Sequence, residues 1–295
     1  MFAQFVNVLY SIVDRIYIGN IPVIGADSLA GAGVCAPIIT LLSSFGTLIG
    51  IGGSVLFSVR LGAGDEKSAR HIVANSFSML LIFSGILTIV FLLTKDYLLR
   101  WFGASADIFP YANTYMTIYT LGTFFALLSM GMNYFITAQG YPGLGMLTTL
   151  IGAIVNIVLD PVFIFGLNLD VRGAALATVL SQMCSCFYVL SFLFGKKTFL
   201  KIQRKNMKLE ARIILPSLAL GLATFIMQAS ESIITVCFNS SLLKYGGDIA
   251  VGAMTILTSV MQFAMLPLQG IAQGAQPISS YNYGAKNADR VRKTF

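Results

Sequence analysis

Three acidic residues lie deep inside long apolar stretches of this sequence: Asp14, Asp160 and Glu231. The other nine of the twelve acidic residues lie between such stretches or at their ends. If the stretches cross a bilayer, an aspartate at a helix centre costs about 2.5 to 3.5 kcal/mol, so it is kept where it is hydrated, paired or functional. These three residues are therefore the first candidates for function.

Asp160 has the most informative neighbours. Asn156 lies one turn earlier on the same helix face, and Pro161 follows directly, which removes a backbone donor and frees the carbonyl of Ile157. Carboxylate, amide and carbonyl oxygens are the ligands that a small hard cation prefers. In a low dielectric, the same carboxylate could instead hold a proton. The pattern predicts a cation or proton site, and the alternative is a polar contact that only holds helices together.

The other two acids have polar neighbours of their own. Asp14 follows Tyr10 by one turn, and no salt bridge with Arg15 is expected because adjacent helical residues point about 100° apart. Glu231 follows Gln228 by three residues, which gives its helix a polar face. For Glu231, a place in a substrate cavity and a purely structural role both remain open.

The elements that position these residues must be membrane helices. Apolar residues make up 56% of the 295-residue chain, charged residues 11%, and the mean hydropathy is +0.81. A soluble domain carries about 25% charged residues. The composition excludes a soluble globule and a disordered chain. The net charge of +7 comes from Lys and Arg residues between the apolar stretches, where it indicates the orientation in the membrane, so no nucleic-acid partner is expected.

Eight charge-poor runs are long enough, or nearly so, to cross a hydrocarbon core, which needs roughly 20 residues. Short joints rich in Gly, Pro, Asn and Asp separate most of them. The sequence therefore predicts an all-α, polytopic bundle in the lipid bilayer. The expected spans are residues 1–18, 29–59, 71–94, 108–138, 144–168, 173–195, 212–243 and 249–282.

Positive charge is unevenly divided between alternate joints. With the N-terminus in the cytoplasm, fourteen Lys and Arg residues lie on the cytoplasmic side and four on the other. Because Lys and Arg accumulate in cytoplasmic loops, this excess predicts that orientation. The longest joint, residues 196–210, is a basic cytoplasmic linker.

The chain after the linker repeats its beginning. A shift of 221 pairs Asp27 with Asp248, and a shift of 222 pairs Gly52 with Gly274 and Gly62-Ala63 with Gly284-Ala285. Six spans separate the equivalents, so the repeats share one orientation about an axis along the membrane normal. We expect two six-helix lobes, with about eight of twelve helices present. Residues 1–195 would form helices 1–6, with helix 1 shortened, and residues 211–295 would form helices 7–8 and the start of 9.

Four segments resemble the multidrug and toxic compound extrusion (MATE) transporters, and within them the bacterial multidrug efflux branch. They are LYSIVDRIYIGN at 9–20, NIVLDPVFIFG at 156–166, RGAALATVLSQ at 172–182 and LPLQGIAQGAQPISSYNYGAK at 266–286. The resemblance implies a monomeric plasma-membrane antiporter, not an enzyme, that exports amphipathic organic cations in exchange for Na⁺ or H⁺ without another cofactor. It also implies a chain that lacks the start of helix 1 and helices 9 to 12.

The resemblance further implies which residues form the sites. Asp14, Asn156, Asp160 and Thr178 match a site for the coupling Na⁺ or H⁺. Tyr10, Tyr115 and Asn133 match positions that line the cavity, and Gln228 and Glu231 are further candidates for its lining. Glu231 does not match cleanly the seventh-helix glutamate of some relatives.

Two other functions remain as alternatives. A lipid-linked oligosaccharide flippase of the same superfamily would share the lobes, but it should line its cavity with several Arg or Lys residues for a diphosphate. Here only Arg15 lies at depth. A membrane-embedded enzyme is disfavoured because the sequence has no nucleophile and base pair and no metal-binding motif such as His-Glu-x-x-His.

Overall fold

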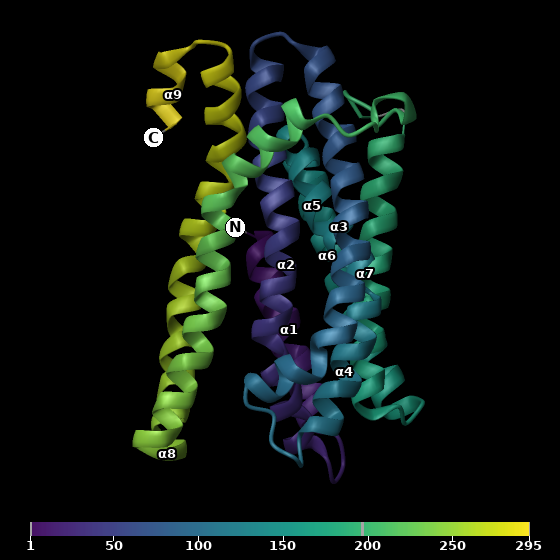
Figure 1. Cartoon of the computed structure of the whole chain (residues 1–295), viewed down its shortest axis with the longest axis vertical. Coiled ribbons are helices and arrows are strands. Elements are labelled where there is room, and N and C mark those ends of the chain that lie inside the picture. Colours follow the sequence, from purple (N-terminus) through teal and green to yellow (C-terminus); the bar gives the residue numbers. More distant parts are fainter. Residues whose placement is uncertain (1, 196–197, 295) are drawn as a thin grey trace.

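The structure of the chain is a computed structural model that describes residues 2–195 and 198–294, and within these residues it contains helices and no strand. The helices are α1 (Phe2–Gly19), α2 (Gly25–Gly62), α3 (Glu66–Trp101), α4 (Phe109–Leu121), α5 (Thr123–Ala138), α6 (Pro142–Pro161), η1 (Val162–Gly166), α7 (Asp170–Phe194), η2 (Arg204–Asn206), α8 (Ala211–Gly284) and α9 (Ala288–Thr294) (Figure 1).

Long apolar helices dominate this bundle. Five helical stretches of the described residues are each long and apolar enough to cross a membrane, and the bent pair α4 and α5 makes a sixth. The prediction of an all-α, polytopic membrane bundle is confirmed.

The expected span 108–138 is not one straight helix. It divides into α4 and α5, which meet at Gly122 with a bend of 56°. At this point α7 comes close, because a Cβ atom on Gly122 would lie 2.4 Å from Cγ2 of Val179. Glycine at this position therefore permits both the bend and the close approach of α7. The spacing of apolar residues along 108–138 does not show that the span bends there.

The joint expected at Gly246-Gly247-Asp248 is also different, because the backbone of α8 remains helical through it. α8 nevertheless reverses direction (Figure 1). Ser217 and Tyr281 both approach α2, at Gly52 and Gly62 respectively. A straight helix would separate Ser217 and Tyr281 by roughly 96 Å, whereas ten residues of α2 span only about 15 Å.

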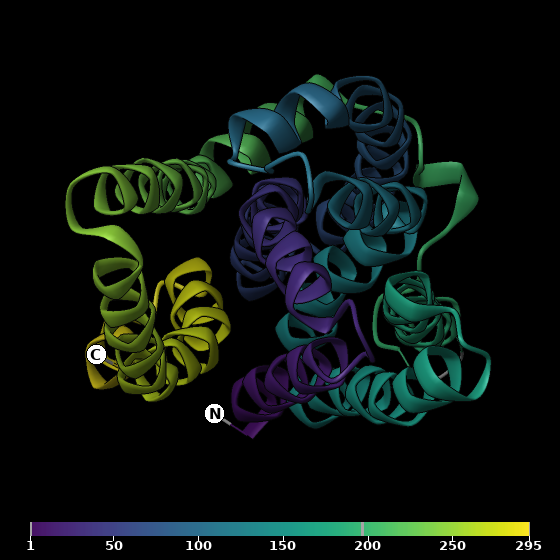
Figure 2. The same cartoon turned by 90° about the horizontal axis from the view of Figure 1, so that it is seen from below.

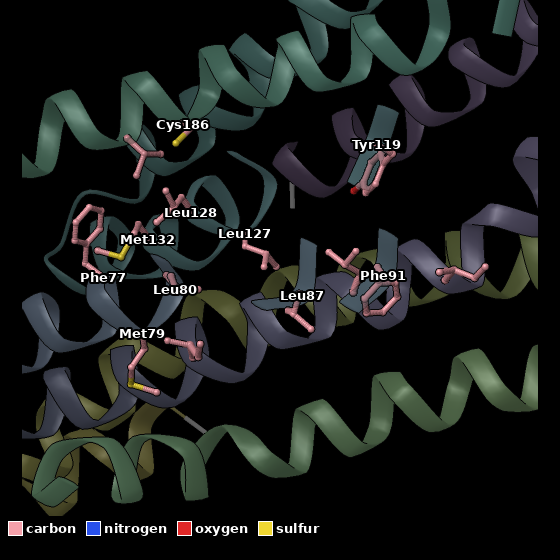
Figure 3. Close-up of a cluster of buried hydrophobic side chains, with 14 of the residues drawn as sticks. Phe77, Met79, Leu80, Leu87, Phe91, Tyr119, Leu127, Leu128, Met132 and Cys186 are labelled. Carbon is pink, nitrogen blue, oxygen red and sulfur yellow. The ribbon is translucent and has the colours of Figure 1, made fainter. Parts of the chain in front are cut away.

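A continuous apolar core holds α3, α4, α5 and α7 together. Figure 3 shows part of it, including Leu80 and Leu87 of α3, Leu128 and Met132 of α5, and Cys186 of α7, all of them buried. α1 packs along α6, and α6 packs along α7. Seen from below, α1 (dark purple) lies beside these teal helices (Figure 2). This arrangement brings polar residues of three helices together.

Candidate functional site

Asp14 of α1 and Asp160 of α6 lie in direct contact. Asp160 has no exposed surface, and the two carboxyl groups are within hydrogen-bonding reach of each other. Two carboxylates cannot hydrogen bond to one another, since neither has a hydrogen to donate. The contact therefore requires one proton or one cation between the two groups.

Asn156 and Thr178 complete this group. The Asn156 amide Nδ2 donates to Oδ1 of Asp160 at 3.3 Å and to Oγ1 of Thr178 at 3.5 Å. Thr178 in turn donates to the carbonyl of Ala174, one turn back on α7, at 3.0 Å. The structure thus brings together all four residues that the resemblance to the family implies as the coupling site. We refer to Asp14, Asn156, Asp160 and Thr178 as the acidic cluster.

Local backbone irregularity accompanies the acidic cluster. Directly after Asp160, Pro161 ends α6, and the chain continues as the π-helix η1, in which Leu167 donates to the carbonyl of Val162 at 2.9 Å. π-helical turns are rare and often accompany functional sites. Gly173 of α7 lies against this turn, since a Cβ atom there would lie 2.8 Å from the carbonyl oxygen of Phe163. The close approach brings α7 to Asp160.

Three oxygens of the acidic cluster lack a donor: Asp14 Oδ1, Asn156 Oδ1 and Asp160 Oδ2 are buried without a hydrogen bond. An unsatisfied buried polar group costs about 1–3 kcal/mol. A proton or a small hard cation would satisfy these oxygens, since all three are ligands that Na⁺ accepts. The described residues contain no group of three or more His, Cys, Asp or Glu that could hold a metal ion.

Beside the cluster lies a cavity of about 850 Å³, enclosed by α1, α2, α4, α5, α6, α7 and α8. Four of the five residues expected there do line it: Tyr10, Asn133, Gln228 and Glu231. Glu231 is the single charged side chain among the described residues that line the cavity, and the remaining polar lining consists of amides and hydroxyls. The cavity is therefore polar, aromatic in part, and negatively charged.

Tyr115, the fifth residue expected in the cavity, is not one of its lining residues. It is buried, hydrogen bonds with Thr178, and stacks on Tyr119 with ring centroids 6.5 Å apart. Tyr119, one turn further along α4, lines the cavity instead. Tyr115 thus contacts the acidic cluster through Thr178 and lies outside the cavity lining.

Tyr10 connects the two sites. It lines the cavity and also lies close enough to Asp14, one turn further along α1, for an electrostatic interaction. The acidic cluster itself does not line the cavity. A change at Asp14 can therefore reach the cavity wall through one turn of α1.

The sequence did not single out Gln182 or Tyr119. Gln182 Nε2 donates to the hydroxyl of Tyr119 at 3.3 Å, and both residues line the cavity. A signal for Gln182 was present, because it lies one turn after Thr178 within an apolar run and so shares its helix face.

A multi-pass helical bundle with a polar cavity beside buried carboxylates is an architecture typical of membrane transporters. The chain belongs to the MatE family, whose family model matches residues 1–162 and 222–295. This agrees with the predicted family, and at the level of the family it confirms a transporter rather than an enzyme.

Individual relatives agree with this assignment. The chain is 29% identical over 295 residues to the multidrug export protein MepA of Staphylococcus haemolyticus; the match covers all of this chain and 64% of that protein. The MATE multidrug transporter DinF-BH, solved as a complex, is 34% identical with a TM-score of 0.92, covering 100% and 66% of the two chains. A MOP superfamily transporter from Pyrococcus furiosus, described as having a binding pocket of reverse polarity, is 28% identical with a TM-score of 0.90, covering 100% and 65%. The chain thus spans about two thirds of the length of these proteins.

Proposed function

We propose that this protein is a secondary active antiporter that exports amphipathic cationic drugs or metabolites in exchange for Na⁺ or H⁺. The observation that carries this proposal is the contact between Asp14 and Asp160, with three donorless oxygens, directly beside the cavity. Such a group binds one positive charge at a time, which is what a coupling site needs.

The lining of the cavity supports a cationic substrate. Glu231 supplies a negative charge, and the tyrosines Tyr10, Tyr119 and Tyr134 offer aromatic faces, which attract flat organic cations. No Lys, Arg or His occurs among the described residues that line the cavity. A flippase for lipid-linked oligosaccharides would need such residues for the diphosphate, so the antiporter is favoured. The relatives named as multidrug export proteins point the same way.

Coupling follows from the position of Asp14 on α1. An incoming Na⁺ or H⁺ neutralises the acidic cluster and changes how α1 packs on α6. One turn away, Tyr10 moves with the helix and alters the cavity wall, which lowers the affinity for the substrate. By linkage, a bound substrate lowers the affinity for the ion to the same degree, and this reciprocity makes binding of one oppose binding of the other.

The arrangement in the membrane is part of the same proposal. We place the protein as a monomer in the plasma membrane, with its N-terminus in the cytoplasm because of the distribution of Lys and Arg. Residues 1–195 form the first lobe, residues 196–210 the cytoplasmic linker, and residues 211–295 the first part of the second lobe. In this scheme, the lobes alternately expose the cavity to each side.

Efflux of a fluorescent rhodamine cation from cells that express the protein tests the coupling role. Asp160→Asn keeps the size of the side chain but removes the charge, so we expect efflux to fall to the level of cells without the protein. Asp96→Asn is the matched control, because Asp96 is an exposed carboxylate at the far end of α3, and it should leave efflux unchanged. Undiminished efflux with Asp160→Asn, at equal expression, would exclude a coupling role for the acidic cluster.

A further inference from the structure

α2 and α8 touch backbone to backbone near the linker end of the molecule. A Cβ atom built on Gly62 of α2 would lie 1.9 Å from the carbonyl oxygen of Tyr281. One built on Gly284 of α8 would lie 2.0 Å from the carbonyl oxygen of Val59. No side chain fits at either glycine without moving a helix, because the obstructing atom belongs to the backbone.

This contact is symmetric about the internal repeat. Gly62 and Gly284 are repeat equivalents, 222 residues apart, and so are Val59 and Tyr281. The contact of Gly62 with Tyr281 therefore corresponds, under the repeat, to the contact of Gly284 with Val59, as in an interface between two identical subunits. The contact therefore lies on the pseudo-two-fold axis between the predicted lobes.

A second contact of the same kind supports the first. A Cβ atom on Gly52 would lie 1.9 Å from the carbonyl oxygen of Ser217, and one on Gly221 would lie 2.0 Å from that of Leu48. We refer to Gly52 and Gly62 of α2, together with Gly221 and Gly284 of α8, as the glycine seam.

The Gly62–Gly284 part of the glycine seam lies beyond the cavity on its linker side, and the Gly52–Gly221 part lies on α2 between the lining residues Ser43 and Ser54. On α2, Ser54 lines the cavity and Gly62 follows about two turns later; on α8, Pro277 lines the cavity and Tyr281 follows one turn later. The ribbons of α2 and α8 approach each other at this end and diverge toward the other (Figure 1). The Gly62–Gly284 contact thus closes the space between the two helices where the lining residues end.

We infer that the glycine seam is the closed gate of the cavity at its linker end, and that its four glycines are positioning residues for transport. This inference rests on the proposed alternating access. Small residues let helix backbones pack closely in a membrane without interlocking side chains. Such a surface separates and closes again as a unit when the lobes rock.

Added side chains at the seam should therefore favour the state in which the linker end is open. Gly62→Ala and Gly284→Ala each force the two helices apart, and symmetry predicts the same effect for both. Gly33→Ala is the matched control on α2, because a Cβ atom there would meet no atom within 4 Å. Gly52→Ala and Gly221→Ala give two further independent tests.

The readout is access to the cavity, measured without transport. A cysteine replaces Ser129, which lines the cavity, in a protein whose four native cysteines are alanine. A membrane-impermeant maleimide is then added to sealed vesicles that expose only the linker end. Size-exclusion chromatography selects the variants that fold.

We expect the seam variants to label about tenfold faster than the parent, because overpacking such a contact shifts a two-state equilibrium by about that factor. Gly33→Ala should label at the parental rate. If all the folded seam variants also label at the parental rate, the gate does not exist. Failure of the antiporter proposal would be recognised separately, since Asp160→Asn would then leave efflux of the rhodamine cation intact whatever the labelling shows.

Discussion

Thr178 contributes one hydroxyl oxygen to the acidic cluster, and that oxygen can be removed with little change in side-chain size. Thr178→Val deletes the acceptor of the Asn156 amide and leaves the two carboxylates in place. A net hydrogen bond is worth about 0.5–1.5 kcal/mol, so we expect the ion concentration for half-maximal efflux of the rhodamine cation to rise roughly 2- to 10-fold. The maximal rate should change little.

The control for this change is Thr114→Val. Thr114 makes the same kind of bond to the carbonyl one turn back, on Pro110, but lies on α4 away from both the acidic cluster and the cavity. An unchanged ion dependence in Thr178→Val, or an equal shift in Thr114→Val, would remove Thr178 from the coupling site.

Residue types alone predicted much of the candidate site. Asp14 and Asp160 stand out because lipid penalises charge, and Asn156 stands out because it shares a helix face with Asp160. The distinction between Tyr115 and Tyr119 could not be predicted, since the two lie one turn apart on the same face. Only the packing of α4 against α7 determines which of them reaches the cavity.

At the scale of the elements, Asp65 fixes the start of α3. Its carboxylate accepts a hydrogen bond from the Ser68 backbone amide at 3.0 Å, and this and the side-chain hydrogen bond of Ser68 hold the pKa of Asp65 below its ordinary value of 3.8. We expect Asp65→Ala to lower the free energy of unfolding by about 1 kcal/mol, whereas Asp65→Ser, which can still cap the helix, should lose less.

The pH dependence of this cap has a defined sign. Because the pKa of Asp65 is lowered in the folded protein, the carboxylate stabilises the fold above pH 3.8 and loses that effect as the pH falls through the lowered value. Thermal unfolding of the parent and of Asp65→Ala should therefore differ at pH 7, and the difference should shrink as the pH falls through the lowered pKa of Asp65. A difference that does not change over this range of pH would show that the cap does not depend on the charge.

The ends of a helix could be predicted where a cluster of turn-forming residues follows it, and they were missed where no such cluster is present or where the helix continues through one. The turn at Gly62-Ala63-Gly64-Asp65 separates α2 from α3 as expected, since Gly64 adopts a φ of +77° that favours glycine. The bend at Gly122 was missed, because glycine also occurs inside straight membrane helices. The helical path through Gly246 and Gly247 was missed for the opposite reason, since consecutive glycines usually end a helix.

At the scale of the whole molecule, the repeat in the sequence carries more information than the number of spans. Its offset of 222 predicts that α2 and the returning half of α8 are equivalent, and the symmetric contact of Gly62 with Gly284 is consistent with that equivalence. The cavity could not be located from the sequence, because its walls come from seven helices whose relative placement depends on the packing of α8.

The proposed exchange depends on a single ion site that Asp14 and Asp160 share. The most direct test compares Asp14→Asn, Asp160→Asn and the double variant in proteoliposomes, by following exchange of the rhodamine cation driven by an imposed Na⁺ or H⁺ gradient. Residues that act as one unit are strongly non-additive, so we predict that either single variant loses as much exchange as the double variant. A shared ion site would be contradicted if one single variant kept parental exchange, or if the fold-loss of exchange in the double variant equalled the product of the fold-losses in the two single variants.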